Sequence, residues 1–337
     1  RALASGRSTG SVAFAFRAVD GAGRSATLPA GGNGTPLRFY VVPSFRTVRM
    51  PVVPFGHVSK GETVLSLPWG TGSSRAGLVL GNESPTLGPS SFDVDARGGI
   101  YLLDGLQDRL AVFSGGRLVR ETRLPASSQY DVAVAGDGTA FVLSRREGRT
   151  VAFRVDPSGS LSGTFDLGDV VPSEIRAVGG GAAVKTLPVD AWRTLGPRGL
   201  EPGLDTGRPL SDGGQLLTVA RPNEVRLATL RGAVVSRAVR IGSSAALGEL
   251  GLAEPDGKGG YVVVVHVWRQ EPTPADQYEV VHVASGGRVT AFGVPNAAFA
   301  QTAALSKFRL GADGTLYELT SSPDGMRIVR FQIGGNR

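Results

Sequence analysis

The sequence predicts an all-β protein, a six-bladed β-propeller, and three observations lead to this prediction. A unit of roughly 35–45 residues, made of four short strand-like runs, recurs along the chain. Apolar and polar residues alternate inside those runs, as they do in sheets that pack face to face. The runs are separated by turns rich in glycine, of which the chain has 49 residues. Repeated four-stranded units of this length are typical of propeller blades.

The plainest copy of the unit covers residues 90–125. Its expected strands are 91–96, 99–104, 109–113 and 117–124. Glycine pairs at 98–99 and 115–116 separate the first strand from the second and the third from the fourth. Glycine supplies the positive φ that tight hairpin turns require. We therefore take this copy as the pattern for one blade.

Five further copies follow the same pattern less regularly. They are 130–168, 174–206, 207–242, 248–295 and the three-stranded 307–335. Apolar residues align between copies, and the column in the second strand is Tyr101, Phe141, Val184, Val262 and Tyr317. We expect these columns to form the core between neighbouring blades.

The sixth copy lacks its outermost strand, and an earlier segment supplies it. Residues 61–70 read GETVLSLPWG and alternate like the fourth strands of other copies. A lone exposed strand is an aggregation hazard, so it needs a partner. We predict antiparallel pairing of residues 62–68 with 326–333, which closes the ring and defines a propeller domain over 57–337.

Residues 1–56 lie outside the repeat and are predicted to form an extended arm. A hairpin is expected around Asp20-Gly21, because Asp-Gly pairs favour such turns. The rest is apolar and interrupted by Pro43, Pro51 and Pro54, which suits a sheet edge. We expect the arm either to lie along the propeller or to reach a neighbouring chain.

Composition limits the function classes. The chain has no cysteine, which excludes disulfides and thiolate metal sites. No apolar run reaches the roughly 18 residues of a membrane helix. The net charge of +7 comes from scattered arginines instead of a dense basic stripe with aromatic residues. We therefore expect no nucleic-acid partner and no membrane span, although peripheral contact with a membrane or cell surface stays open.

One run resembles a known repeat family. In YLLDGLQDRLAVF, residues 101–113, a strand ends in Asp104 and is followed by Arg109, Leu110 and Phe113. This spacing resembles the NHL repeat, and in the second copy Ser144 stands in place of the aspartate. The resemblance implies a ring-shaped propeller, often six-bladed, in extracytoplasmic bacterial proteins. Its members include scaffolds, binding modules and enzymes.

The repeat also indicates which loops share a face. Second-to-third-strand loops and connections between blades lie together, on what we call the loop face. This face carries the long insertions 69–91, 268–277 and 295–307. Function tends to reside on loops held by a rigid scaffold, so we predict binding there. The candidate binding residues, aromatic or charged as interface anchors tend to be, are Trp69, Arg75, Arg145, Arg146, Trp192, Trp268, Arg269 and Glu271.

The central channel is the other candidate site. The innermost strands open with Ser91, Asp131, Glu174 and Lys307, and two residues further on stand Asp93, Ala133, Arg176 and Arg309. Calcium needs six to eight oxygen ligands, whereas these residues mix both charges. We expect ion pairs across the channel and no cofactor. If calcium does bind, the candidate ligands are Asp93, Asp131 and Glu174.

No catalytic motif is present, so the leading hypothesis is a non-enzymatic binding or scaffold propeller. We expect a protein-interaction subunit of an exported or surface-associated bacterial assembly. The chain begins without methionine, as it would after loss of a signal peptide or behind a disordered leader; we expect a removed leader and a periplasmic, extracellular or cell-surface location. One alternative is a metal-dependent enzyme of the propeller lactonase or lyase type. A second is a carbohydrate-binding lectin, in which exposed Trp268 and Trp192 stack on sugars.

Overall fold

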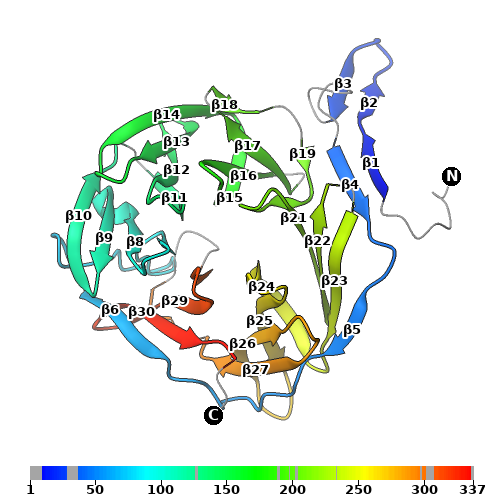
Figure 1. Cartoon of the computed structure of the whole chain (residues 1–337). Coiled ribbons are helices and arrows are strands. Elements are labelled where there is room, and N and C mark those ends of the chain that lie inside the picture. Colours follow the sequence, from blue (N-terminus) through cyan, green and yellow to red (C-terminus); the bar gives the residue numbers. More distant parts are fainter. Residues whose placement is uncertain are drawn as a thin grey trace.

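The chain folds into a six-bladed β-propeller, as the sequence predicts (Figure 1). The computed structural model describes residues 10–28, 37–125, 128–187, 190–196, 198–201, 204–232, 234–296, 298–300 and 307–334. Within these ranges the one helical element is the 3₁₀ turn η2 (Gly105–Gln107), and no helix has the length and apolar character needed to cross a membrane. Parts of the arm 1–56 and of the insertion 295–307 lie outside the described residues.

Blades 1 and 2 are regular antiparallel sheets whose strands follow chain order from the channel outward. Glycine turns at 98 and 115–116, all with positive φ, connect the strands of blade 1 as expected. The strands are β7 (Ser91–Val94), β8 (Ile100–Asp104), β9 (Arg109–Ser114) and β10 (Arg117–Arg123), then β11 (Ser128–Val134), β12 (Ala140–Arg146), β13 (Arg149–Val155) and β14 (Leu161–Gly168).

Blades 3 and 4 are less regular. The outer edge of blade 3 is divided into two short pieces, and the innermost strand of blade 4 has two residues. The strands are β15 (Val171–Val178), β16 (Gly181–Leu187), β17 (Ala191–Gly196), β18 (Gly199–Leu200) and β19 (Leu204–Asp205), then β20 (Arg208–Pro209), β21 (Gln215–Arg221), β22 (Glu224–Arg231) and β23 (Val234–Gly242).

Blade 6 confirms the predicted closure of the ring. Its outermost strand is β6 (Glu62–Pro68), which pairs antiparallel with β30, placing Leu65 opposite Ile328. Leu65 and Leu67 are buried and so hold the two ends of the ring together. The remaining strands are β24 (Ala246–Pro255), β25 (Tyr261–Arg269), β26 (Ala275–Val283) and β27 (Val289–Val294) of blade 5, and β28 (Phe308–Leu310), β29 (Thr315–Ser322) and β30 (Gly325–Gln332) of blade 6.

Part of the arm lies along the propeller, the first of the two expected locations. Strand β4 (Leu37–Val41) pairs parallel with β19 on the edge of blade 3, and β5 (Arg46–Arg49) pairs parallel with β23 on the edge of blade 4. The Tyr40 hydroxyl donates to Asp205 at 2.6 Å. Residues 37–49 therefore span the outside of the junction between blades 3 and 4.

Residues 10–28 of the arm project outward from the edge of blade 3 (Figure 1), whereas Met50 and Phe55 pack in the cluster between blades 4 and 5. Strand β1 (Gly10–Phe14) pairs with β4 and extends the sheet of blade 3 outward. Strands β2 (Phe16–Val19) and β3 (Ser25–Leu28) form a separate hairpin. Its turn includes Asp20, whose carboxylate accepts the backbone N–H groups of Ala22 and Arg24. The hairpin predicted at Asp20-Gly21 is confirmed.

Apolar clusters fill five of the six junctions between blades. The second-strand column behaves as predicted, since Tyr101, Phe141, Val184, Val262 and Tyr317 are all buried. The clusters lie between blades 1 and 2, 2 and 3, 4 and 5, 5 and 6, and 6 and 1. In the described part of the chain, no comparable cluster joins blades 3 and 4. That junction differs from the others, and it bears on the site.

Candidate functional site

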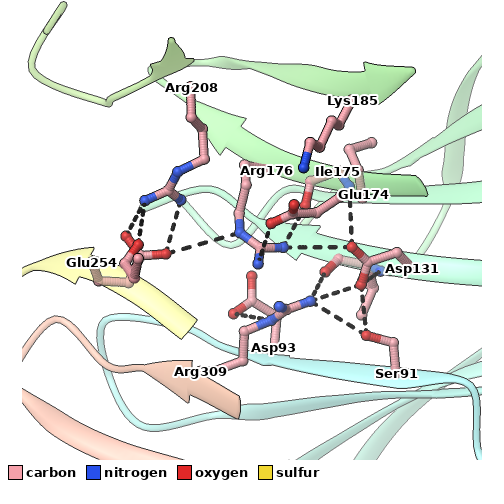
Figure 2. A network of polar contacts seen from close by, with 12 residues as sticks. Ser91, Asp93, Asp131, Glu174, Ile175, Arg176, Lys185, Arg208, Glu254 and Arg309 are labelled. Atoms are coloured by element: carbon pink, nitrogen blue, oxygen red, sulfur yellow. Dashed lines mark hydrogen bonds and ion pairs between the residues drawn. The ribbon is translucent and has the colours of Figure 1, made fainter. Parts of the chain in front are cut away.

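A network of ion pairs lines the central channel, and Asp131 is its hub (Figure 2). This carboxylate on β11 is fully buried. One oxygen accepts the Ser91 hydroxyl at 2.7 Å and an Nη of Arg309 at 2.7 Å. The other oxygen accepts the backbone N–H of Ile175 at 3.0 Å and an Nη of Arg176 at 3.4 Å. Asp131 thereby connects blades 1, 2, 3 and 6.

The network continues into the two remaining blades. Arg176 lies 2.5 Å from a Glu174 oxygen, and its Nε lies 3.9 Å from Glu254 on β24. The Glu254 carboxylate in turn accepts hydrogen bonds from two guanidinium nitrogens of Arg208 on β20. In one of them the nitrogen and the oxygen lie 2.8 Å apart. All six innermost strands therefore contribute a side chain to one polar ring. The ion pairs expected across the channel are present, and they connect every blade.

Burial and charge act in opposite directions on these groups. Burial raises the pKa of Asp93, while the Arg309 guanidinium and the N–H groups of Val134 and Val94 oppose that rise. Burial also disfavours the charged form of Arg176. The surrounding carboxylates, Glu174 foremost, outweigh this effect and raise the pKa of Arg176. Arg176 therefore stays charged because acidic neighbours surround it.

The three candidate metal ligands lie in this network, each close to an arginine. Asp93 is 3.5 Å from Arg309, Asp131 contacts Arg309 and Arg176, and Glu174 contacts Arg176. The guanidinium groups of the protein thus already pair with the carboxylates that calcium would need as ligands. Among the described residues, no three His, Asp or Glu side chains are grouped so as to hold a metal ion.

Arg208 and Glu254 were missed by the sequence reasoning. Strand β20 is too short to show alternation, and two bulges in β24 shift its register. The first hairpin turn gives the signal that could have found them. In blades 1, 2, 4, 5 and 6 the N–H that precedes this turn donates to the C=O four residues later. The residues two positions before that donor are Asp93, Ala133, Arg208, Glu254 and Arg309, so four of the five are charged.

A cavity of about 390 Å³ lies at the junction of blades 3 and 4. One wall is a row of side chains across blade 3, because Glu174 pairs in register with Lys185 and Lys185 with Trp192. The opposite wall comes from Leu216 and Thr218 of β21 and from residues 249–254 of β24. Blade 4 leaves this space because its innermost strand, β20, has only two residues.

Trp192 corrects one expectation. It is 5% exposed, so it cannot serve as the exposed sugar-stacking residue of the lectin hypothesis. The physical reason is its place inside blade 3: its strand β17 has β16 on one side and β18 and β19 on the other. The indole therefore forms part of the cavity wall and is not a surface platform.

Trp69 and Arg75 stabilise the first long connection. The half-buried Trp69 donates from Nε1 to the carbonyl of Ser322 at 2.9 Å, and Arg75 donates to the carbonyl of Trp69 at 2.9 Å. The buried Asp104 accepts the N–H of Gly77 at 3.1 Å and lies 3.2 Å from Arg109. Asp104 and Arg109 of the NHL-like run thus hold the base of this loop.

The remaining candidates are exposed but dispersed. Arg145 and Arg146 lie at the turn between β12 and β13 of blade 2. Trp268, 42% exposed, Arg269 and Glu271 lie across the ring in blade 5. The Arg269 guanidinium lies 4.8 Å from the centre of the Phe55 ring in the arm. The structure therefore does not gather the predicted loop-face residues into a single site.

The comparisons with known proteins give the chain neither a family nor a function. No protein-family model matches the chain, and no curated protein is similar to it. Similar solved structures include hydrazine synthase of Kuenenia stuttgartiensis (15% identity, 72% of this chain and 80% of that one, TM-score 0.46), virginiamycin B lyase of Staphylococcus aureus (9%, 76% and 99%, 0.43) and U3-55K (12%, 78% and 100%, 0.45). The class of the protein, a six-bladed β-propeller, follows from its own blades.

Proposed function

We propose that this protein is a non-enzymatic binding propeller, a protein-interaction subunit of an exported or surface-associated bacterial assembly. The observation that carries the proposal is the hairpin of β2 and β3, which stands away from the ring (Figure 1). All four residues of β2 are exposed, with Phe16 at 61% and Val19 at 58%. Because the two residues stand three positions apart in a strand, their side chains lie on opposite faces of the hairpin, and both faces expose an apolar group that another protein can cover.

The sheet next to the hairpin supports the same function. Strand β1 pairs with β4 on one side, and among the described strands none pairs with its other side. An open edge presents N–H and C=O groups to which an extended segment of a partner can add as a further strand. We therefore propose that the partner protein adds a strand to β1 and packs on the hairpin.

Two further features support the proposed protein interaction and the proposed location. Trp268 on the loop face is 42% exposed and supplies the kind of aromatic side chain that anchors protein interfaces. The resemblance of residues 101–113 to NHL repeats supports an extracytoplasmic bacterial location. Neither feature requires the chain to catalyse a reaction.

Site-specific photo-crosslinking in the native host tests the proposal. A photoreactive residue at Val19 should give one discrete adduct with a partner protein. The matched control is Val234, which is 65% exposed but lies in an outer strand of blade 4. The Phe16→Ser variant should weaken the Val19 adduct. An absent adduct at Val19, or the same adducts at Val19 and Val234, would refute the proposed function.

A further inference from the structure

A second pocket lies between blades 4 and 5, on the face opposite the loop face, where the hairpin turns of the blades lie. Its volume of about 650 Å³ is within the range of roughly 300–1,000 Å³ that is usual for small-molecule sites. One wall comes from residues 210–212 and 229–237 of blade 4, and the other from residues 254–261 of blade 5. Ser211 and Ser236 contribute hydroxyl groups to the lining, so the pocket suits a polar ligand.

Arg237, on β23, is held in the wall of this pocket. Its guanidinium carbon lies 5.4 Å from the centre of the Tyr261 ring, and its Nη2 donates to the carbonyl of Ala284 at 2.8 Å. The residue is half-buried, and its side chain forms no other hydrogen bond and no ion pair with the described residues. The stacking and the single bond fix the guanidinium group in place and leave most of its N–H groups to a ligand.

The two carboxylates of the pocket wall are already paired with other arginines. Asp212 lies 2.6 Å from Arg231, and a Glu254 oxygen lies 2.8 Å from a nitrogen of Arg208. Both carboxylates are therefore engaged elsewhere, and the charge of Arg237 is not balanced by either of them.

The turns beside the pocket add positive charge. Lys258 and Arg288 are exposed, and neither forms an ion pair with the described residues. Asp256, in the same turn as Lys258, is bonded to His282 at 2.9 Å and accepts the N–H groups of Lys258 and Gly260. Cations therefore outnumber free carboxylates here, which favours an anionic ligand.

At the junction of blades 1 and 2, a single arginine fastens the corresponding turn. Arg120 lies 5.6 Å from the centre of the Tyr101 ring and donates to the carbonyl of Pro157, in the turn between β13 and β14. It lies against Gly159 of that turn, where a β-carbon would clash with the arginine side chain. This is the arrangement of a structural arginine in the ring.

At the junction of blades 4 and 5, the arm supplies that structural arginine. Arg46 of β5 donates to the carbonyl of Gly286 at 2.8 Å, in the turn between β26 and β27. It lies against Gly287, which makes the same backbone hydrogen bond in its turn as Gly159 does in blade 2. Arg237 is therefore a second arginine at a turn that one arginine already fastens, and it is the one that lines the pocket.

We propose that this pocket binds a phosphomonoester, with its phosphate group at Arg237. The planar guanidinium group bonds two phosphate oxygens at once, and a phosphomonoester carries about −1.5 to −2 charges at neutral pH. Such a dianion matches the excess of cations better than a carboxylate, which has one charge. The site is separate from the hairpin of β2 and β3, and it holds or fails independently of the proposed protein partner.

Isothermal titration calorimetry with the full chain tests the proposal, with D-glucose 6-phosphate as the probe. The matched analogues are D-glucose, which lacks the phosphate, and D-glucuronate, which carries a carboxylate in its place. We expect saturable binding of glucose 6-phosphate. For each analogue we expect an affinity lower by about tenfold or more, because the bidentate bond or the second charge is lost.

Vesicle co-sedimentation distinguishes a free ligand from a lipid headgroup as the source of the phosphate. Phosphatidylcholine vesicles that contain phosphatidic acid present a phosphomonoester, whereas those that contain phosphatidylglycerol present a phosphodiester. Binding to the phosphatidic acid vesicles alone would support the proposal and identify a lipid as the source. Equal binding to both kinds of vesicle, without binding of glucose 6-phosphate, would overturn it.

Two variants and a matched control locate the binding. Arg237→Met should lower the affinity by about tenfold or more, and Arg237→Lys, which keeps the charge but loses the planar fork, by a smaller factor. Arg120→Met removes an arginine that stacks on a tyrosine in the same way, far from the pocket, and should leave binding unchanged. Thermal melts verify that all three variants stay folded. Absent binding of both glucose 6-phosphate and phosphatidic acid vesicles, equal affinity for glucuronate, or unchanged affinity in Arg237→Met would overturn the proposal.

Discussion

Replacing Asp131 by alanine tests whether the channel network stabilises the ring. The substitution leaves Arg309, whose side chain is 5% exposed, with Asp93 at 3.5 Å as its remaining carboxylate. It also deprives the Ser91 hydroxyl and the Ile175 N–H of their acceptor. Removing one partner of a buried ion pair typically costs about 3–5 kcal/mol, because the other charge stays buried. We therefore expect Asp131→Ala to lower the free energy of unfolding by about 4 kcal/mol.

Urea denaturation followed by tryptophan fluorescence measures the effect. The control is Arg149→Ala, which removes an exposed ion pair with Asp166 at 2.9 Å and should cost no more than about 1 kcal/mol. Arg309→Met in the Asp131→Ala background should recover part of the loss, because it removes the stranded charge. A loss in Asp131→Ala no larger than in Arg149→Ala, or no recovery in the double variant, would refute this reasoning.

Three further predictions concern pH, closure and the arm. Burial raises the pKa of Glu279 from 4.5 to about 7, so its contribution to stability is present below pH 4.5 and is lost as pH rises through about 7. Thermal melts should show this loss, about 3 kcal/mol, and Glu279→Gln should remove it; an equal loss in both proteins contradicts the prediction. Leu65→Ala leaves a cavity at a buried position of β6 and should lower the free energy of unfolding, measured by urea denaturation, by about 2–5 kcal/mol. Val119→Ala, at a 60% exposed position, should lower it little. Tyr40→Phe removes the hydroxyl bonded to Asp205 and should cost about 1 kcal/mol and speed hydrogen exchange in β4 and β19, while unchanged exchange would argue against a bridging role.

The sequence predicts the ring well because its signals are local. Alternation of period two and glycine turns define each blade, and Leu65 and Leu67 show the same alternation in the closing strand. Asp93, Arg176 and Arg309 stand at matching positions of their strands, so the mixed charge of the channel is visible before the structure is known.

Other features depend on contacts between separate strands, which the sequence of one short segment does not reveal. Arg208 and Glu254 join the network from a two-residue strand and from a bulged strand, where alternation no longer indicates the side-chain direction. The cavity between blades 3 and 4 is an absence of packing, and the burial of Trp192 depends on the pairing of its strand β17 with β16, β18 and β19. Strands β4 and β5 pair in parallel with β19 and β23 at the outer edges of blades 3 and 4. The sequence of the arm indicates this pairing only through its prolines, which are compatible with an edge strand.

The position of β6 also constrains the order in which the molecule can be made. This strand leaves the ribosome before any blade, yet its partner β30 ends the last blade. Until nearly the whole chain has emerged, β6 has no strand to pair with, and closure across so long a loop is slow. We expect the earlier blades to form one after another while the ring stays open. The final step of folding is then a single encounter between the two ends of the propeller.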